Sequence, residues 1–78
     1  MSTVAHRGFH ITAKPYQLHA TGQWTVDIEI RRKGRLRAFS SDARYQTEGE
    51  ATVRSFEFGR QIIAGQVPGC SLDSLLKD

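Results

Sequence analysis

Alternation of apolar and polar residues is the clearest pattern along the chain. Residues 23–31 alternate at every second position, and residues 8–14 alternate more weakly. The apolar positions are Phe9, Ile11 and Ala13 in the weaker segment and Trp24, Val26, Ile28 and Ile30 in the stronger one. Because successive side chains of a β-strand point to opposite faces of the sheet, this spacing predicts two strands that each bury one face.

Residues that favour loops and turns separate and follow these strands. Residues 15–22 are predicted to form a loop, because Pro15 lacks the N–H that a central strand needs and Gly22 favours a turn. After the second strand, Gly34 can adopt a positive φ without a Cβ penalty. Residues 32–35 therefore predict a tight turn that returns the chain as an antiparallel strand.

A third strand is predicted over residues 35–40, and its register is ambiguous. Strict alternation places either Leu36 or Phe39 toward the core, but not both. We expect a β-bulge that turns both side chains inward, because an exposed Phe39 would leave a large apolar group in water. The polar residues 40–44 are expected to form a loop.

A period of 3.6 residues replaces the alternation and predicts a helix over residues 48–64. Thr47 and Glu50 have the spacing of a capping box, Gly65 suits the position after the last turn, and Glu50 and Arg54 are spaced for an i,i+4 ion pair. The stripe expected to lie on the sheet comprises Ala51, Thr52, Ser55, Phe56, Phe58, Gly59, Ile62 and Ile63.

A short helical turn is predicted near the C-terminus. Pro68 and Gly69 interrupt the chain, and Ser71 can then cap a turn that carries Leu72, Leu75 and Leu76. A helix this short needs a surface to cover, and we expect it to pack against the main helix at Phe56 and Ile63.

These elements predict one α+β domain over residues 1–78. The expected architecture is a three-stranded antiparallel β-meander packed on one long helix, β-β-β-α, with a short C-terminal helical turn and a flexible N-terminus over about residues 1–7. The second face of the sheet is expected to be open to water.

Composition narrows the expected functions. A chain of 78 residues buries only about 60% of the surface that its unfolded form exposes, so we expect one modest core and no deep catalytic cleft. The sequence contains no nucleophile elbow and no glycine-rich phosphate loop, and its three histidines and one cysteine lack the spacing of a metal site. We therefore expect a non-enzymatic protein without cofactor or metal.

The single cysteine and the lack of a long apolar run predict a cytoplasmic protein with no membrane partner. Cys70 precedes the predicted short helix, where a thiol can become reactive. We interpret it instead as a small apolar residue after a turn.

Positive charge is concentrated in one segment. The chain carries a net charge of +3, yet five cations lie within residues 31–37, so the remaining residues sum to −2. This segment suits electrostatic attraction to phosphates. The candidate nucleic-acid-binding residues are Arg31, Arg32, Lys33, Arg35 and Arg37, with Lys14 and His10 on the open sheet face.

Two other interpretations of these features stay open. The basic segment can be an ordinary solvated turn, partly neutralised by Asp27 or Glu29. In a different class of function, the open sheet face or an edge strand would bind another protein or a second copy of the chain. Edge pairing would be nearly insensitive to salt, whereas phosphate binding would weaken as salt rises.

Part of the sequence resembles the plant AP2/ERF DNA-binding domain. The matching residues are Trp24, Val26, Asp27 and Ile28, then Phe39, Tyr45, Thr47, Glu48, Glu50 and Ala51. The resemblance implies a three-stranded sheet and helix that lays its sheet in the DNA major groove, as in the arm-binding domains of some integrases. Glu29 stands where that family has a base-contacting arginine, and the family's DNA-contacting tryptophans have no counterpart here.

The layout also resembles small bacterial β-β-β-α proteins of unassigned function. The segment F-G-R-Q-I-I-A-G at the end of the predicted helix, residues 58–65, carries this resemblance. It implies the same fold and no particular activity.

Overall fold

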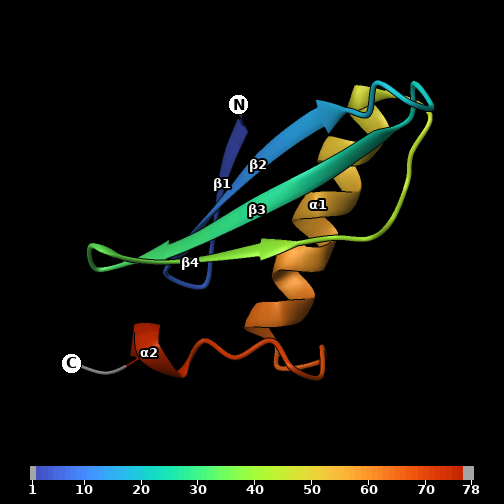
Figure 1. Ribbon diagram of the computed structural model, residues 1–78. Helices are drawn as coiled ribbons and strands as arrows, with labels where there is room; N and C mark the ends of the chain where they lie inside the picture. Colours follow the sequence, from blue (N-terminus) through green and yellow to red (C-terminus); the bar gives the residue numbers. More distant parts are fainter. Residues whose placement is uncertain (1, 77–78) are drawn as a thin grey trace.

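One antiparallel sheet and one long helix form the protein, in a computed structural model that describes residues 2–76. The strands follow one another across the sheet in chain order: β1 Ser2–His6, β2 Phe9–Gln17, β3 Trp24–Arg32 and β4 Arg35–Ser40. Helix α1, Glu48–Ile63, crosses one face, and the short helix α2, Asp73–Leu76, contacts β3 and β4 (Figure 1). The predicted α+β class is confirmed, with four strands in place of three.

Strand β1 is the element that the sequence pattern missed. Residues 2–6 were predicted to be flexible, but they pair with β2 from Ser2 opposite Ala13 to His6 opposite Phe9. A two-residue turn joins the strands, with φ of 51° at Arg7 and 82° at Gly8. Val4 is the only large apolar residue of β1, so alternation is too weak there to indicate a strand.

Strand β2 continues through Pro15, where a loop was predicted. Pro15 pairs with Val26 of β3, while the ladder with β1 ends earlier, at Ala13. In an antiparallel ladder alternate residues direct their N–H groups to opposite sides, and the missing N–H of Pro15 falls on the side that β1 does not reach. Proline is tolerated there because β2 is locally an edge strand.

Strand β4 is regular, and the predicted bulge is wrong. The register with β3 runs without interruption from Arg32 opposite Arg35 to Asp27 opposite Ser40. Phe39 lies opposite the buried Ile28 and so faces the helix, whereas Leu36 points to the open face and is 40% exposed. The two-residue turn at Lys33 and Gly34 fixes this register.

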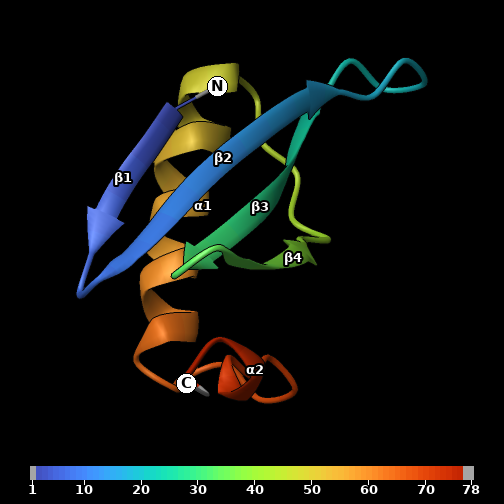
Figure 2. The same ribbon diagram turned by 90° about the vertical axis from the view of Figure 1, so that its left-hand side faces the viewer.

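Small side chains allow α1 to lie close to the sheet, over β2 and β3 (Figure 2). The buried residues of the helix are Ala51, Ser55, Gly59 and Ile62. At Gly59 the approach is so close that an added Cβ would lie 2.8 Å from Cγ2 of Ile11, which is fully buried. The core between helix and sheet is completed by Val26, Ile28 and Ile30, while Trp24 at the end of the sheet is only half-buried.

The predicted cap at Thr47 is confirmed, whereas Glu50 does not bond to the N–H of Thr47 as a capping box would have it. The Thr47 hydroxyl accepts a hydrogen bond from the N–H of Glu50 at 3.1 Å, while the Glu50 carboxylate accepts from the N–H of Gln46 at 3.4 Å. Arg54 was expected to pair with Glu50. It pairs instead with Glu57, at 2.9 Å. The hydrogen bond and charge of Glu57 raise the pKa of Arg54.

The C-terminal segment covers the end of the sheet that α1 leaves open. Leu72 and Leu75 are buried in the core, and Ser71 accepts a hydrogen bond from the N–H of Asp73 at 3.2 Å. The short helix was predicted to pack along the edge of α1, but it contacts β3 and β4 instead. Cys70 is half-buried and packs against the core, and the side chain of Leu76 lies outside the described residues.

Gly59→Ala tests the close approach of helix and sheet. The new methyl group would overlap Ile11, and we expect a net loss of about 1 to 2 kcal/mol after the gain of about 1 kcal/mol in helix propensity. Gly49→Ala is the control, because nothing lies within 4 Å of its Cβ position. Urea unfolding should show Gly49→Ala to be neutral or stabilising; equal losses for both variants would contradict this packing.

Thr47→Ala tests the helix cap. Removing the hydroxyl leaves the N–H of Glu50 without its acceptor, and we expect a loss of about 1 kcal/mol in the free energy of unfolding. Thr47→Ser keeps the acceptor and should stay within a few tenths of a kcal/mol of the parent. A thermal unfolding series compares the three proteins, and identical midpoints for Ala and parent would refute the cap.

Candidate binding surface

Two turns at the same end of the sheet bring the cations together. The turn at Arg7 and Gly8 joins β1 to β2, and the turn at Lys33 and Gly34 joins β3 to β4. Because His10 pairs with Arg31, the two turns begin at the same level of the sheet. We call residues 6–10 and 30–37 the basic end; these segments contain six Lys and Arg residues and no Asp or Glu.

The sheet register divides the cations of the basic end between two faces. Arg31 lies beside His10 on the open face, where both are exposed. Arg32, Arg35 and Arg37 lie on the helix face, because Arg32 pairs with Arg35 and Arg37 pairs with the buried Ile30. The cations predicted to form one site therefore do not share one surface.

Two of the predicted binding residues serve the fold. Arg32 donates a hydrogen bond to the carbonyl oxygen of Leu75 at 3.0 Å, and its guanidinium lies 5.8 Å from the centre of the Phe9 ring. Arg37 lies 5.4 Å from the centre of the Phe39 ring. Both arginines are half-buried, and each guanidinium lies over an aromatic ring. The side chain of Arg32 attaches the C-terminal segment to the sheet, and its assignment to a binding site stays a prediction.

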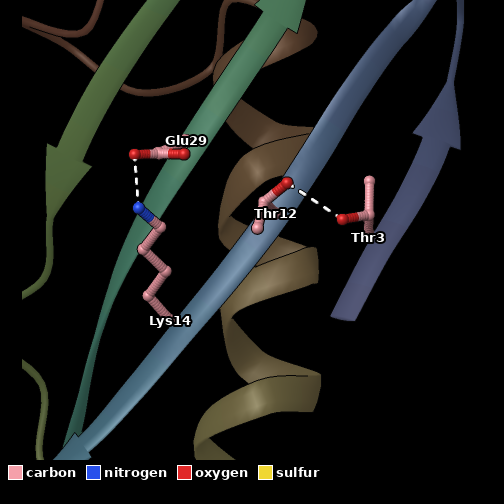
Figure 3. Close-up of polar contacts among 4 residues, drawn as sticks. All are labelled: Thr3, Thr12, Lys14 and Glu29. Carbon is pink, nitrogen blue, oxygen red and sulfur yellow. Dashed lines mark hydrogen bonds and ion pairs between the residues drawn. The ribbon is translucent and has the colours of Figure 1, made fainter. Parts of the chain in front are cut away.

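The open face contains a shallow polar depression of about 650 Å³. Its lining comes from three strands: Thr3, His10, Thr12, Lys14, Glu29 and Arg31. Figure 3 shows the middle of this face, with the side chains in front of the sheet and α1 behind it. Thr3 and Thr12 share a hydrogen bond of 3.0 Å between β1 and β2. The structure therefore brings His10, Lys14 and Arg31 to one face, as predicted.

Carboxylates reduce the positive charge of the open face. Lys14 donates a hydrogen bond to Glu29 at 2.6 Å, and the two side chains are 40% and 24% exposed (Figure 3). Asp27 is Lys14's partner in the register and lies on the same face. The depression is thus nearly neutral in its middle, and positive charge increases only toward Arg31 and the basic end.

The opposite end of the open face is covered by residues 41–44. Thr25 belongs to the open face, yet it is 1% exposed and donates to the carbonyl oxygens of Ser41 and Ala43 at 3.2 and 3.0 Å. The guanidinium of Arg44 lies 3.4 Å from the Thr25 hydroxyl. The loop therefore covers Thr25, whereas Tyr16, which pairs with Thr25 on the same face, is 45% exposed.

Arg7 is the binding candidate that the sequence interpretation missed. It lies in a segment that was predicted to be flexible, far along the chain from the basic hairpin. The dipeptide Arg7-Gly8 repeats the cation-glycine pattern of Lys33-Gly34, and both pairs have positive φ. The same turn signal that located the second hairpin could therefore have located the first.

Other kinds of site find little support in residues 2–76. No group of three or more His, Cys, Asp or Glu side chains within them could hold a metal ion. None of the helices in this range is long and apolar enough to cross a membrane. Comparisons with models of protein families, with curated proteins and with solved structures found no match.

Arg32→Gln tests the structural role of this side chain. The variant loses the charged hydrogen bond to Leu75 and the contact with Phe9, so we expect a loss of about 1 to 3 kcal/mol. Arg31→Gln removes the same charge from an exposed position and should change stability by less than about 0.5 kcal/mol. Urea unfolding measures both, and hydrogen exchange should show faster opening at Leu75 in Arg32→Gln alone. Similar behaviour of the two variants would argue against this anchor.

Proposed function

We propose that the protein is a small non-enzymatic binding module that binds the phosphate backbone of nucleic acids through its basic end. The observation that carries this proposal is the alignment of the two hairpin turns. It places Arg7 at the same end as the basic hairpin, in segments that contain no carboxylate. Clustered cations attract a polyanion over distances of about a Debye length and need no shaped pocket.

The distribution of charge along the molecule supports binding at this end. Helix α1 begins with Glu48 and Glu50 at the far end from the two turns (Figures 1 and 2). The loop that precedes α1 adds no net charge, because it contains both Asp42 and Arg44. A polyanion approaching the molecule is therefore attracted to the turns and repelled from the opposite end, which orients the encounter.

The turn tips suit the phosphate contacts better than the sheet face does. Arg7 and Lys33 occupy the tips, and Arg31 is exposed on the adjoining open face. The resemblance to AP2/ERF domains implied contacts across the sheet, but Asp27 and Glu29 would meet phosphates there with the wrong charge. We therefore assign binding to Arg7, Arg31 and Lys33, flanked by His10 and Arg35, with Lys14 contributing little because Glu29 pairs with it.

A backbone-directed interaction has a defined signature. Contacts with phosphate carry no sequence information, so affinity should be similar for unrelated duplexes. About three phosphate contacts predict a slope of log affinity against log salt concentration near −3, with dissociation constants on the order of micromolar to 100 µM. Such a partner also agrees with the cytoplasmic location that the single cysteine predicts.

Fluorescence anisotropy with labelled DNA and RNA duplexes tests the proposal. We expect the double variant Arg31→Gln, Lys33→Gln to bind at least tenfold more weakly at low salt and to lower the salt slope by about 2. The matched control is Arg44→Gln, Arg54→Gln, which removes the same charge from outside the basic end. If the control binds nearly as tightly as the parent, the loss of affinity in the first variant comes from contacts at the basic end and not from the lower net charge.

Two results would overturn the proposal. One is a parent protein that binds neither duplex at low salt, and the other is an equal loss of affinity in both double variants. Unfolding midpoints of the variants accompany the binding data, because Arg44 also contacts the loop around Thr25.

A further inference from the structure

The outer edge of β1 is an exposed strand edge without the usual protection against pairing. Within residues 2–76 no strand pairs with this edge, which forms the border of the sheet (Figure 2). Residues 2–5 contain neither a charge nor a proline, and the uninterrupted register with β2 leaves no room for a bulge. Charges, prolines and bulges are the devices by which proteins protect such edges.

The other border of the sheet is protected. Strand β4 carries Arg35 and Arg37, and α2 packs against it. The two edges therefore differ in kind, and only β1 offers a plain strand for backbone pairing.

The pairing of β1 with β2 identifies the residues of β1 whose backbone N–H and C=O groups point outward. In a two-residue hairpin the residues that flank the turn exchange hydrogen bonds, so His6 directs its N–H and C=O toward β2. Alternation then gives Val4 the same inward direction and leaves the groups of Thr3 and Ala5 on the outer edge.

We propose that β1 pairs with β1 of a second copy of the chain, antiparallel about a two-fold axis at Val4. In this register Thr3 lies opposite Ala5 of the second copy, and each pair exchanges two hydrogen bonds, about four in total. Ser2 lies opposite His6 of the second copy, so no two positive charges face each other along the strand pair. The two sheets join into one continuous sheet.

Apolar side chains on the helix side of β1 would gain cover from the second copy. Glu57 and Gln61 line a groove with His6 and Arg7, which shows that this flank of α1 faces β1. Phe58 lies on the same flank, one turn from Gln61, and is half-buried. Val4 is half-buried as well. A second sheet beside β1 would remove more of both side chains from water.

Charge complementarity favours a second copy over an arbitrary extended peptide. The two-fold axis places the basic end of each chain beside the far end of its partner, where α1 begins with Glu48 and Glu50. The two basic ends are thereby kept at opposite ends of the joined sheet. Opposite charges at the rim of an interface speed association and fix its orientation.

Sedimentation equilibrium over a concentration range from about 10 µM to 1 mM tests this pairing. A short strand pair with little apolar cover lies at the small end of protein interfaces, so we expect a dissociation constant of roughly 10 to 100 µM. Ala5→Pro removes one outward N–H per chain without touching the ladder to β2, because proline is tolerated on an edge strand. We expect it to weaken dimerisation at least tenfold, whereas Ala5→Val keeps the N–H and should dimerise as the parent does.

Charged substitutions at Thr3 and Ala5 test the proposed register between the two β1 strands without the use of proline. Thr3→Lys combined with Ala5→Lys places like charges opposite each other across the two-fold axis and should dissociate the dimer. Thr3→Lys combined with Ala5→Glu places opposite charges there and should restore it. Both variants lose the same hydrogen bond to Thr12, and circular dichroism confirms that each is folded.

A parent protein that is monomeric at 1 mM overturns the proposal. So does a dimer that neither Ala5→Pro nor the like-charged pair weakens, which would mean that another surface joins the copies. Nucleic-acid binding is measured separately at low protein concentration, so failure of one proposal leaves the other to be judged on its own data.

Discussion

The close contact between Gly59 and Ile11 sets the arrangement of the whole molecule. A helix whose buried stripe is Ala51, Ser55 and Gly59 can approach the sheet to a distance that larger side chains would forbid. At this distance α1 rests on the central strands β2 and β3, and its apolar neighbours pack on either side. The borders of the sheet, β1 and β4, are therefore left largely outside the cover of the helix.

The two borders of the sheet differ in how they are covered, and this difference determines which of them is accessible to a partner. On the β4 side the C-terminal segment fills the gap with Leu72 and Leu75, and Arg32 attaches it through the carbonyl oxygen of Leu75. An arginine that looks like part of a binding cluster thus acts as a structural anchor. On the β1 side nothing equivalent is present among the described residues, so backbone groups and the flank of α1 remain accessible.

The sequence predicted the elements whose signals are local and strong. Strand β3, the turn at Gly34 and the cap at Thr47 were located correctly, because alternation, glycine and the capping box each act within a few residues. Strand β1 was missed because its single large apolar residue, Val4, carries no period, and its strand conformation depends on pairing with β2.

The candidate site was predictable in composition but not in arrangement. Counting charges located the basic segment. The face on which each cation lies depends on the register of β4, because a change of one residue in that register moves every side chain to the other face of the sheet. Leu36 consequently occupies the face opposite to the one expected, and Arg37 lies on the helix face. The contribution of Arg7 depends on two hairpins ending at the same level, a tertiary relation that no local pattern contains.

At the two turn tips, the residue type that supplies positive charge differs from the residue type that the backbone conformation favours. Arg7 and Lys33 both have φ of 51°, a left-handed conformation in which a long side chain costs about 1 kcal/mol or more. Asparagine before glycine is the favoured choice for such turns. An asparagine at either tip would therefore tighten the hairpin and weaken the positive field at once. The chain carries a cation at both tips, so its most stable version and its most positively charged version are different sequences.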